Sequence, residues 1–416
     1  MREAVLHYIW RNRLFEEVTL DGEPLEVLDV GRYNEGDGPD FSLAKVRRGD
    51  FIWVGSVEMH LKSSDWTAHR HERDPRYDRV ILHVVLSDDC EVHNSLGESV
   101  PTAVLTIQER IRNRLDELDV STKALRCTPE LSYISPYSLR SLTEPLLIER
   151  IEEKLTRNGD QKDFHELFYR LLMRYLGAHR NNEVMELVAS ATPLRVLRKH
   201  ASDRGAIESI LLGQGGLLSS TPRDAYEAEL SEQYAFYRTK FDLAPVSGGI
   251  FQKLRVRPPA YPARILAIAA QIICREDALS EAMSACDFEK AKELLAVAPS
   301  VYWRTHIDFG QSYPKALGGI GISTIHSLLI NAVLPVSYLY SQKTGNREKS
   351  REALEYYEEL PPESNRFVRL FEKNGFAAHT AADTQKMLQL YGRYCGPFRC
   401  FFCPLAPAAF SALKSR

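Results

Sequence analysis

The chain has 416 residues, of which 44% are hydrophobic and 26% are charged, and its formal net charge is −3 at pH 7. This is the composition of a globular protein that is long enough for two or three domains. The slightly negative charge excludes binding to nucleic acid through an overall basic field. Such binding would therefore require a local basic patch.

Hydropathy and cysteine usage bear on the location of the protein. No apolar run approaches the roughly 18 residues of a membrane span, and the charged N-terminal segment is unlike a secretory signal. We therefore expect no membrane association. The seven cysteines are an odd number at low density, which argues against a disulfide scaffold and predicts a cytoplasmic location.

The first 108 residues predict an α/β or α+β domain. Hydrophobic periodicity indicates, in chain order, a helix over 3–16, strands over 24–31, 41–47 and 51–62, a helix opened by the polar segment 65–79, and strands over 80–86 and 100–107. The nearly continuous apolar run over 80–86 is typical of a central strand that is buried on both faces. The order helix, three-stranded meander, helix and strand predicts a layered unit.

After residue 108 the pattern becomes helical. We predict no further strands, and helices over 109–118, 140–157, 163–177, 183–190, 205–213, 264–274, 287–296, 323–333, 349–359, 364–374 and 382–392. A Pro- and Gly-rich connector at 241–263 predicts a division of this region. The predicted domains are 1–108 (α/β), 109–245 (helical) and 246–416 (helical, ending in a cysteine cluster).

The predicted hairpin of the second and third strands gathers polar side chains on one face. A three-residue turn around Gly49 sets a register in which Asp40 lies opposite Glu58. The two-residue period of a strand then puts His60 and Lys62 on the same face as Glu58. The alternative interpretation is a polar strand face that only contacts solvent.

This face predicts a divalent-cation site. Two carboxylates about 5 Å apart repel each other unless a cation lies between them. Oxygen ligands of this kind suit Mg²⁺ or Mn²⁺, with Asp40 and Glu58 as the ligands. Lys62 or His60 would then orient an attacking water and stabilise developing negative charge, so all four residues are candidate catalytic residues.

The same residues resemble the catalytic motif of the PD-(D/E)XK nuclease superfamily. Pro39-Asp40 corresponds to the PD half and Glu58-Met59-His60 to the (D/E)XK half, with Lys62 one strand period further on. The predicted order of elements also matches the core of that superfamily. The resemblance implies a restriction-endonuclease-like fold and metal-dependent hydrolysis of DNA or RNA. Because a histidine occupies the usual lysine position, His60 could replace that lysine, Lys62 could serve from a shifted position, or the site could be inactive.

Further polar residues follow the hairpin and are possible accessory groups: Asp65, His69, His71, Asp74 and, within the predicted central strand, His83. The spacing of His69 and His71 suits a loop or strand better than one face of a helix. These residues could be phosphate contacts, groups that support the site, or ligands of a transition metal. The last possibility gives an alternative hypothesis, a zinc- or iron-dependent hydrolase that uses the His60, His69 and His71 cluster.

Longer strings resemble a bacterial family catalogued only as a domain of unknown function. These strings are GPDF, GSVEMHLKSSDW and YDRVILHVV in the first domain, and IESILLGQGGLL (207–218) and LRVRPPAYPARI (254–265) in the helical region. The terminal cysteines belong to the same resemblance, which spans nearly the whole chain. It implies no activity of its own.

A compact group of thiols lies near the C-terminus. Cys395, Cys400 and Cys403 need a fourth ligand to complete a tetrahedral zinc site or to hold a four-iron cluster. Cys127 is the candidate, because it follows the α/β domain and would join the two ends of the chain. The family resemblance also favours this set of four. Zinc and iron–sulfur both remain possible, as do thiols that bind no metal.

A proline-rich segment carries a local group of cations. Arg255, Arg257 and Arg264 lie where proline restricts the backbone, which could direct several guanidinium groups to one side. Contact with nucleic-acid phosphates is one interpretation, and solvated charges on a connector are the other. With the hairpin site, these residues predict a nuclease with nucleic acid as partner. A scaffold that binds nucleic acid or protein without catalysis is a further alternative.

Overall fold

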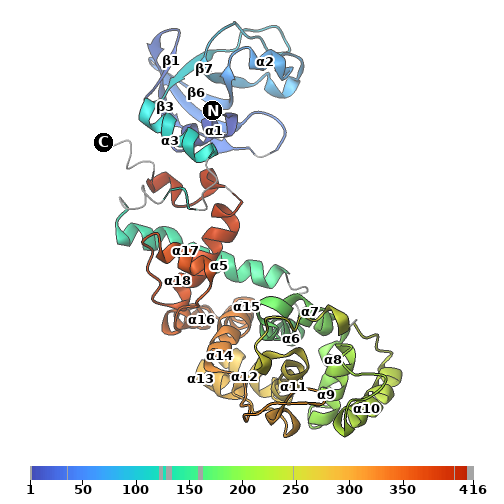
Figure 1. Ribbon diagram of the computed structural model, residues 1–416. Coiled ribbons are helices and arrows are strands. Elements are labelled where there is room, and N and C mark those ends of the chain that lie inside the picture. The colour runs from blue at the N-terminus through green and yellow to red at the C-terminus, as the bar shows by residue number, and fades with distance from the viewer. Residues whose placement is uncertain are drawn as a thin grey trace. The chain divides into compact units, whose positions relative to one another are not determined.

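The computed structural model describes residues 2–34, 36–120, 125–127, 134–157, 163–246, 248–397 and 399–409. Two compact units are present, one formed by Met1–Glu144 with Gln389–Arg416 and the other by Pro145–Leu388 (Figure 1). The predicted boundaries at 108/109 and 245/246 do not coincide with this division. The second unit continues across residue 245 because one hydrophobic core includes side chains from both sides, such as Leu211 and Leu266.

The first unit contains an eight-stranded mixed sheet in the order β2-β1-β8-β7-β6-β5-β3, with β4 paired to β5. β5 and β6 are antiparallel, whereas β7 runs parallel to both β6 and β8. The strands are β1 Glu17–Leu20, β2 Glu23–Pro24, β3 Glu26–Asp29, β4 Arg32–Tyr33, β5 Phe41–Arg48, β6 Phe51–Lys62, β7 Val80–Ser87 and β8 Thr102–Thr106. β5 to β8 match the predicted strands closely, while β1 was not predicted.

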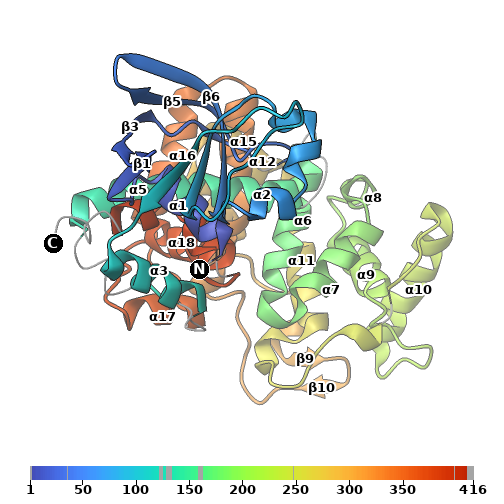
Figure 2. The same cartoon turned by 90° about the horizontal axis from the view of Figure 1, so that it is seen from above.

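Strand β6 lies inside the sheet and is covered by helices. The helices α1 (Glu3–Arg11) and α2 (Asp65–Ala68) both pack against β6. The four consecutive residues 57–60 are therefore buried on both faces of the strand. Figure 2 shows β5 and β6 as the long pair of strands that ends in a projecting hairpin. The buried part of β6 is the part that carries Glu58 and His60.

The turn between β5 and β6 is one residue shorter than predicted. Arg48 pairs with Phe51, which shifts the register of the outer hairpin by one residue. An irregularity between Phe41 and Ala44, where Leu43 has a φ of 58°, inserts one extra residue into β5. Beyond it Phe41 pairs with Val57, so the predicted register holds only next to Asp40, because the bulge cancels the shift.

The segment 65–79 opens a helix, as expected, but this helix is short. The segment is divided into α2 and two short 3₁₀ turns, η1 (His71–Arg73) and η2 (Pro75–Tyr77). Arg70 has a φ of 65°, in the left-handed region, which ends the helical path after α2. Pro75 then prevents a longer helix from forming.

The remaining elements are mainly helical. They are α3 Glu109–Val120 and α5 Pro136–Arg157, followed by α6 Phe164–Leu176, α7 Ala178–Ala191, α8 Leu194–Arg198, α9 Arg204–Gln214, α10 Ala225–Phe241, α11 Pro262–Ile273, α12 Glu276–Ala285, α13 Phe288–Leu295, α14 Ile322–Leu328, α15 Leu334–Lys343, α16 Arg347–Glu359, α17 Arg366–Glu372 and α18 Ala381–Leu390. The prediction of no further strands was wrong, because β9 (His306–Asp308) and β10 (Gln311–Ser312) form a small hairpin. Among the described residues, the sequence analysis missed α8, α10, α12 and α15.

One helical stretch has the length and composition of a membrane span. It covers the 22 residues Ile322–Lys343, and 72% of its most apolar window is buried inside the structure. The sequence analysis overlooked this stretch. This buried fraction is typical of a helix in the core of a folded unit.

Candidate metal centre

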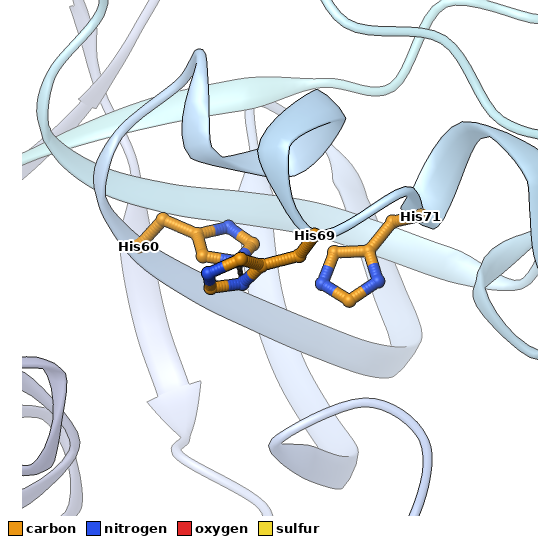
Figure 3. Close-up of side chains that lie close together, drawn as sticks. All are labelled: His60, His69 and His71. Atoms are coloured by element: carbon orange, nitrogen blue, oxygen red, sulfur yellow. Dashed lines mark hydrogen bonds between the residues drawn. The ribbon is translucent and has the colours of Figure 1, made fainter.

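Three histidines converge beside β6. One ring nitrogen from each of His60, His69 and His71 lies within 4.8 Å of the others. Figure 3 shows the three imidazoles facing one another, with His60 on the strand and the other two on the segment that follows it. The left-handed backbone at Arg70 reverses the chain between His69 and His71, so both side chains reach the same place.

The carboxylate of Glu58 lies beside two of these three histidines. Its Oε1 lies 3.3 Å from Nε2 of His71 and 3.7 Å from Nε2 of His60. Its Oε2 accepts a hydrogen bond from the backbone N–H of Asp40 at 3.0 Å, and the Asp40 carboxylate accepts one from the backbone N–H of Met59 at 3.0 Å. Asp40 and Glu58 thus lie side by side and orient each other.

A chain of hydrogen bonds assigns the proton on His60. Thr102 donates its hydroxyl to the Val100 carbonyl, so its oxygen can only accept from Nδ1 of His83, 3.5 Å away. A neutral His83 then has a lone pair on Nε2, which accepts from Nδ1 of His60 at 2.8 Å. Nε2 of His60 is therefore left with a lone pair that points toward Nδ1 of His69, 3.0 Å away.

The distances fit a single transition-metal ion. For metal–nitrogen bonds of about 2.0–2.1 Å and tetrahedral angles, two ligand atoms lie about 3.3–3.4 Å apart. Three of the six separations between these ligand atoms are 3.0, 3.3 and 3.7 Å, and the three nitrogens all lie within 4.8 Å of one another. The Glu58 oxygen 3.3 Å away is the polar neighbour of the buried Nε2 of His71, but among the described residues this nitrogen makes no hydrogen bond of good geometry. A bound cation would satisfy this nitrogen.

Burial keeps the imidazoles of His60 and His83 neutral. Burial, reinforced by the neighbouring histidines, lowers the pKa of His60 to about 2, and burial lowers the pKa of His83 to about 3. Both rings are therefore neutral near pH 7, and neutral imidazole is the metal ligand. Burial also raises the pKa of Glu58, and the nearby Asp40 carboxylate adds to this effect. A cation at the site would favour the ionised form of Glu58.

The sequence analysis did not identify three residues that support the site. His7 on α1 lies with Nε2 3.1 Å from the Asp40 carboxylate, and the Asp40 charge raises the pKa of His7 although burial opposes it. Tyr77 stacks on the His71 ring at a centroid distance of 3.8 Å. The buried Trp66 ring contacts His60, His71 and His83. Only tertiary packing brings these side chains to the site.

Three predicted residues have other contacts. Lys62 is exposed at the end of β6, and its backbone N–H donates to the Asp65 carboxylate at 3.0 Å. Its positive charge attracts the carboxylate of Asp89. This bond to Asp65 holds the first turn of α2. Asp74 caps η2 by accepting from the backbone N–H of Arg76. All three therefore act at turns around the histidine cluster.

The predicted phosphate-binding arginines separate into two groups. Arg255 and Arg257 are exposed and line a pocket of about 250 Å³ together with Arg180. Arg264 is only 2% exposed and donates to the carbonyls of Trp303, Pro259 and Gly318. Because its guanidinium is used inside the protein, Arg264 is not available for nucleic acid.

The four cysteines proposed as a cluster interact electrostatically. Burial raises the pKa of Cys395, and Cys403, Cys127 and Cys400 raise it further. Burial also raises the pKa of Cys403 to about 11. Arg126, next to Cys127, is hydrogen-bonded to Cys400. The segment around Cys127 and the C-terminal cysteines therefore lie near each other within the first unit.

The chain matches the family described as "Protein of unknown function (DUF2851)" over residues 3–366. It belongs to this family. No curated protein and no solved structure shows a significant match to the chain. The family match covers the histidine cluster and the helical unit up to residue 366, and it ends before the C-terminal cysteines.

Proposed function

We propose that this protein is a metal-dependent hydrolase whose ion is held by His60, His69, His71 and Glu58. The observation that carries the proposal is the convergence of three imidazole nitrogens within 4.8 Å, with a carboxylate oxygen 3.3 Å from one of them. A set of three histidines and one carboxylate suits zinc, iron or manganese better than Mg²⁺, which prefers oxygen ligands.

The residues around the ion have distinct tasks. His83 holds the ring of His60, and the backbone N–H of Asp40 holds Glu58, so the ligand atoms keep their directions. His69 is exposed, which leaves one side of the group open to solvent and substrate. When bound, the ion would polarise a substrate oxygen and activate a water molecule. Asp40, paired with His7, lies beside this position as a group that could accept a proton.

The proposed substrate is a phosphodiester of DNA or RNA. Support comes from the resemblance to the PD-(D/E)XK motif and from the order α1, β3, β5, β6, α2 and β7, in which β7 runs parallel to β6. This is the order that the resemblance implies for a restriction-endonuclease-like core. Arg255 and Arg257 are the exposed arginines that we propose as phosphate contacts, in a cytoplasmic protein.

A second candidate uses oxygen ligands. Asp40 and Glu58 are mutually oriented, as the PD-(D/E)XK resemblance implies for a site that binds Mg²⁺ or Mn²⁺. In that arrangement His60 would take the place of the lysine, because Lys62 is exposed at the strand end. Manganese is compatible with both ligand sets. The two candidates differ in whether His69 is needed to retain the ion.

The four cysteines form a separate proposed site. Cys127, Cys395, Cys400 and Cys403 would hold either zinc or an iron–sulfur cluster, with a structural role that joins the C-terminal segment to the first unit. Absorption spectra of protein purified without oxygen distinguish the two. A brown protein indicates iron–sulfur, whereas a colourless protein with bound zinc indicates a zinc site.

Metal analysis tests the histidine site. We expect wild-type protein and the Lys62→Ala control to retain one equivalent of transition metal beyond that of the cysteine site. His69→Ala should lose this equivalent, and its exposed position means that the fold should persist. Performing the comparison in a Cys400→Ser, Cys403→Ser background removes the contribution of the cysteines. Full metal retention in His69→Ala would contradict the proposed ligand set.

Hydrolysis assays test the substrate class. Bis(p-nitrophenyl) phosphate, single- and double-stranded DNA, and RNA should be offered with zinc, iron(II), manganese or magnesium. We expect cleavage with a transition metal and loss of cleavage in Asp40→Ala and Glu58→Ala. Cleavage that is unchanged in both variants would rule out this site as the source of the activity.

A further inference from the structure

A polar pocket lies within the helical unit, apart from every residue of the metal centre. It has a volume of about 340 Å³, which is the size of a site for a small molecule. Its walls come from the start of α9, from α10, from the end of α11 and from the segment 297–304. Its larger polar side chains are those of Arg204, Glu208, Tyr226, Gln271, Arg275 and Arg304.

Three guanidinium groups contribute positive charge to this pocket. Arg275 donates to the Leu294 carbonyl at 3.1 Å and Arg304 donates to the Pro299 carbonyl at 3.4 Å. These bonds anchor the two side chains and leave most of their N–H groups available. Within the described ranges, no ion pair involves Arg204, Arg275 or Arg304. Guanidinium groups in this state favour phosphate or carboxylate oxygens, which they can bind in pairs.

Gln271 supplies a buried donor without an acceptor. The residue is 6% exposed and lines the pocket, and its Nε2 has no hydrogen-bond partner among the residues that the structure describes. Leaving such a group unsatisfied is unfavourable, so buried amides normally have partners. An acceptor-rich ligand in the pocket would satisfy it.

The buried carboxyl group of Glu208 does not oppose an anion. It is 1% exposed and accepts hydrogen bonds from the Tyr226 hydroxyl at 2.7 Å and from the Trp303 indole N–H at 2.5 Å. Both donors are uncharged, and no cation forms an ion pair with Glu208 within the described ranges. Burial raises the pKa of Glu208, which favours the neutral carboxyl. The pocket therefore carries a net positive charge.

We propose that this pocket binds a small molecule with a phosphate or carboxylate group, and that this group contacts Arg204, Arg275, Arg304 and Gln271. The rest of the ligand would lie against Glu208 and Tyr226, which suits a hydroxyl group. This site is independent of the proposed hydrolase function, because all of its residues belong to the second unit.

Calorimetric titration of the full chain tests this proposal with two probes, inorganic phosphate and malonate, at constant ionic strength set with sodium chloride. We expect saturable binding of at least one probe to the wild type. The double variant Arg204→Gln, Arg304→Gln should weaken binding at least tenfold. Both arginines are exposed, so the variant should fold, and its melting temperature without anion provides the check. Gln271→Leu should weaken binding as well.

Arg195→Gln is the matched control, because Arg195 is an exposed arginine of the same unit outside the pocket. It should bind the probe as the wild type does. Phosphate binding alone assigns a phosphorylated ligand, and malonate binding alone assigns a carboxylate. The proposal is overturned if neither probe binds, or if the double variant binds as tightly as the wild type. Loss of the metal from the first unit should leave this titration unchanged.

Discussion

Two buried glutamates, one in each unit, have opposite electrostatic environments. Glu227 in the helical unit is fully buried, and its carboxylate accepts hydrogen bonds from the Arg223 side chain and from the backbone N–H groups of Ser219 and Arg223. Although burial opposes ionisation, these donors lower the pKa of Glu227 below its ordinary value. Burial instead raises the pKa of Glu58, in the sheet unit.

These two environments distinguish a charged group that stabilises the fold from a candidate metal ligand. Glu227 has a cation and several N–H donors, so its ionised form is already stabilised by the fold. Glu58 has one backbone N–H donor and a close contact with His71, and the effect of burial outweighs both. A buried carboxylate with such an incomplete set of partners is what a metal site requires. Four experiments test this contrast between the two units, from the largest expected effect to the smallest.

Replacing Glu58 should affect activity more than stability. We expect Glu58→Gln to lower metal-dependent hydrolysis at least 10³-fold, equivalent to about 4 kcal/mol in the barrier. Its melting temperature without metal should be unchanged or higher, because a buried charge is removed. Steady-state assays and thermal melts measure the two effects. A variant that melts much earlier but hydrolyses normally would show that Glu58 is a structural residue, like Glu227.

Replacing Glu227 should have the converse effect. We expect Glu227→Gln to destabilise the protein by about 2 to 3 kcal/mol, because the charge-assisted hydrogen bonds from Arg223 are lost. Urea denaturation followed by circular dichroism gives this value. Hydrolysis by the folded fraction should equal that of the wild type, and a loss of activity without a loss of stability would be inconsistent with our comparison.

The bulge in β5 should be sensitive to a side chain at Gly31. Gly31 has a φ of 85°, and an added Cβ would lie 2.5 Å from the Ser42 carbonyl oxygen and 2.9 Å from the Ala44 nitrogen. We expect Gly31→Ala to cost about 2 kcal/mol in stability and to weaken metal binding, since the bulge sets Asp40 opposite Glu58. Gly22→Ala is the control, because Gly22 has a φ of 82° with no atom within 4 Å. Equal losses in both variants would show that φ strain alone is responsible.

The metal-free protein should lose stability in acid through the histidine cluster. Folded His60 stays neutral down to a pKa of about 2, whereas in the unfolded chain it binds a proton near pH 6.5. Its contribution to stability is therefore complete above pH 6.5 and falls below it, by up to about 1.4 kcal/mol per pH unit. Denaturation in chelator at pH 4 to 7 should show a smaller slope for His60→Gln. The exposed His93→Gln variant is the control for the loss of one histidine.

Local sequence patterns predicted the strands that carry the site more accurately than the segments next to them. The strand 51–62 was predicted with its observed bounds, because alternation and flanking turn residues depend on neighbours in the chain. The pairing of Asp40 with Glu58 required two departures from the expected hairpin, a shorter turn and a bulge, which cancel. The helix expected to open in the segment 65–79 is only the short α2, because left-handed Arg70 and Pro75 divide the segment.

Long-range contacts decided the remaining assignments. Arg264 resembled a surface cation, but its buried guanidinium donates to the carbonyls of Trp303 and Gly318, which are distant in the chain, as well as to nearby Pro259. His7 and Tyr77 reach the site only because α1 and η2 fold against the sheet, and no spacing in the sequence encodes that approach. The predicted boundary at 245/246 lies within one compact unit, because apolar side chains on both sides share one core.

The residues that are able to form a site can be recognised in the sequence alone. They lie in a strand that carries Glu58 and His60 and in the histidine-rich segment that follows it. The tertiary structure decided which of them form a site. It brought His69 and His71 to the strand and left Lys62 at its exposed end. The physical reason is that residue type sets the chemistry of a ligand, whereas the convergence of ligands depends on backbone reversals and packing between segments far apart in the chain.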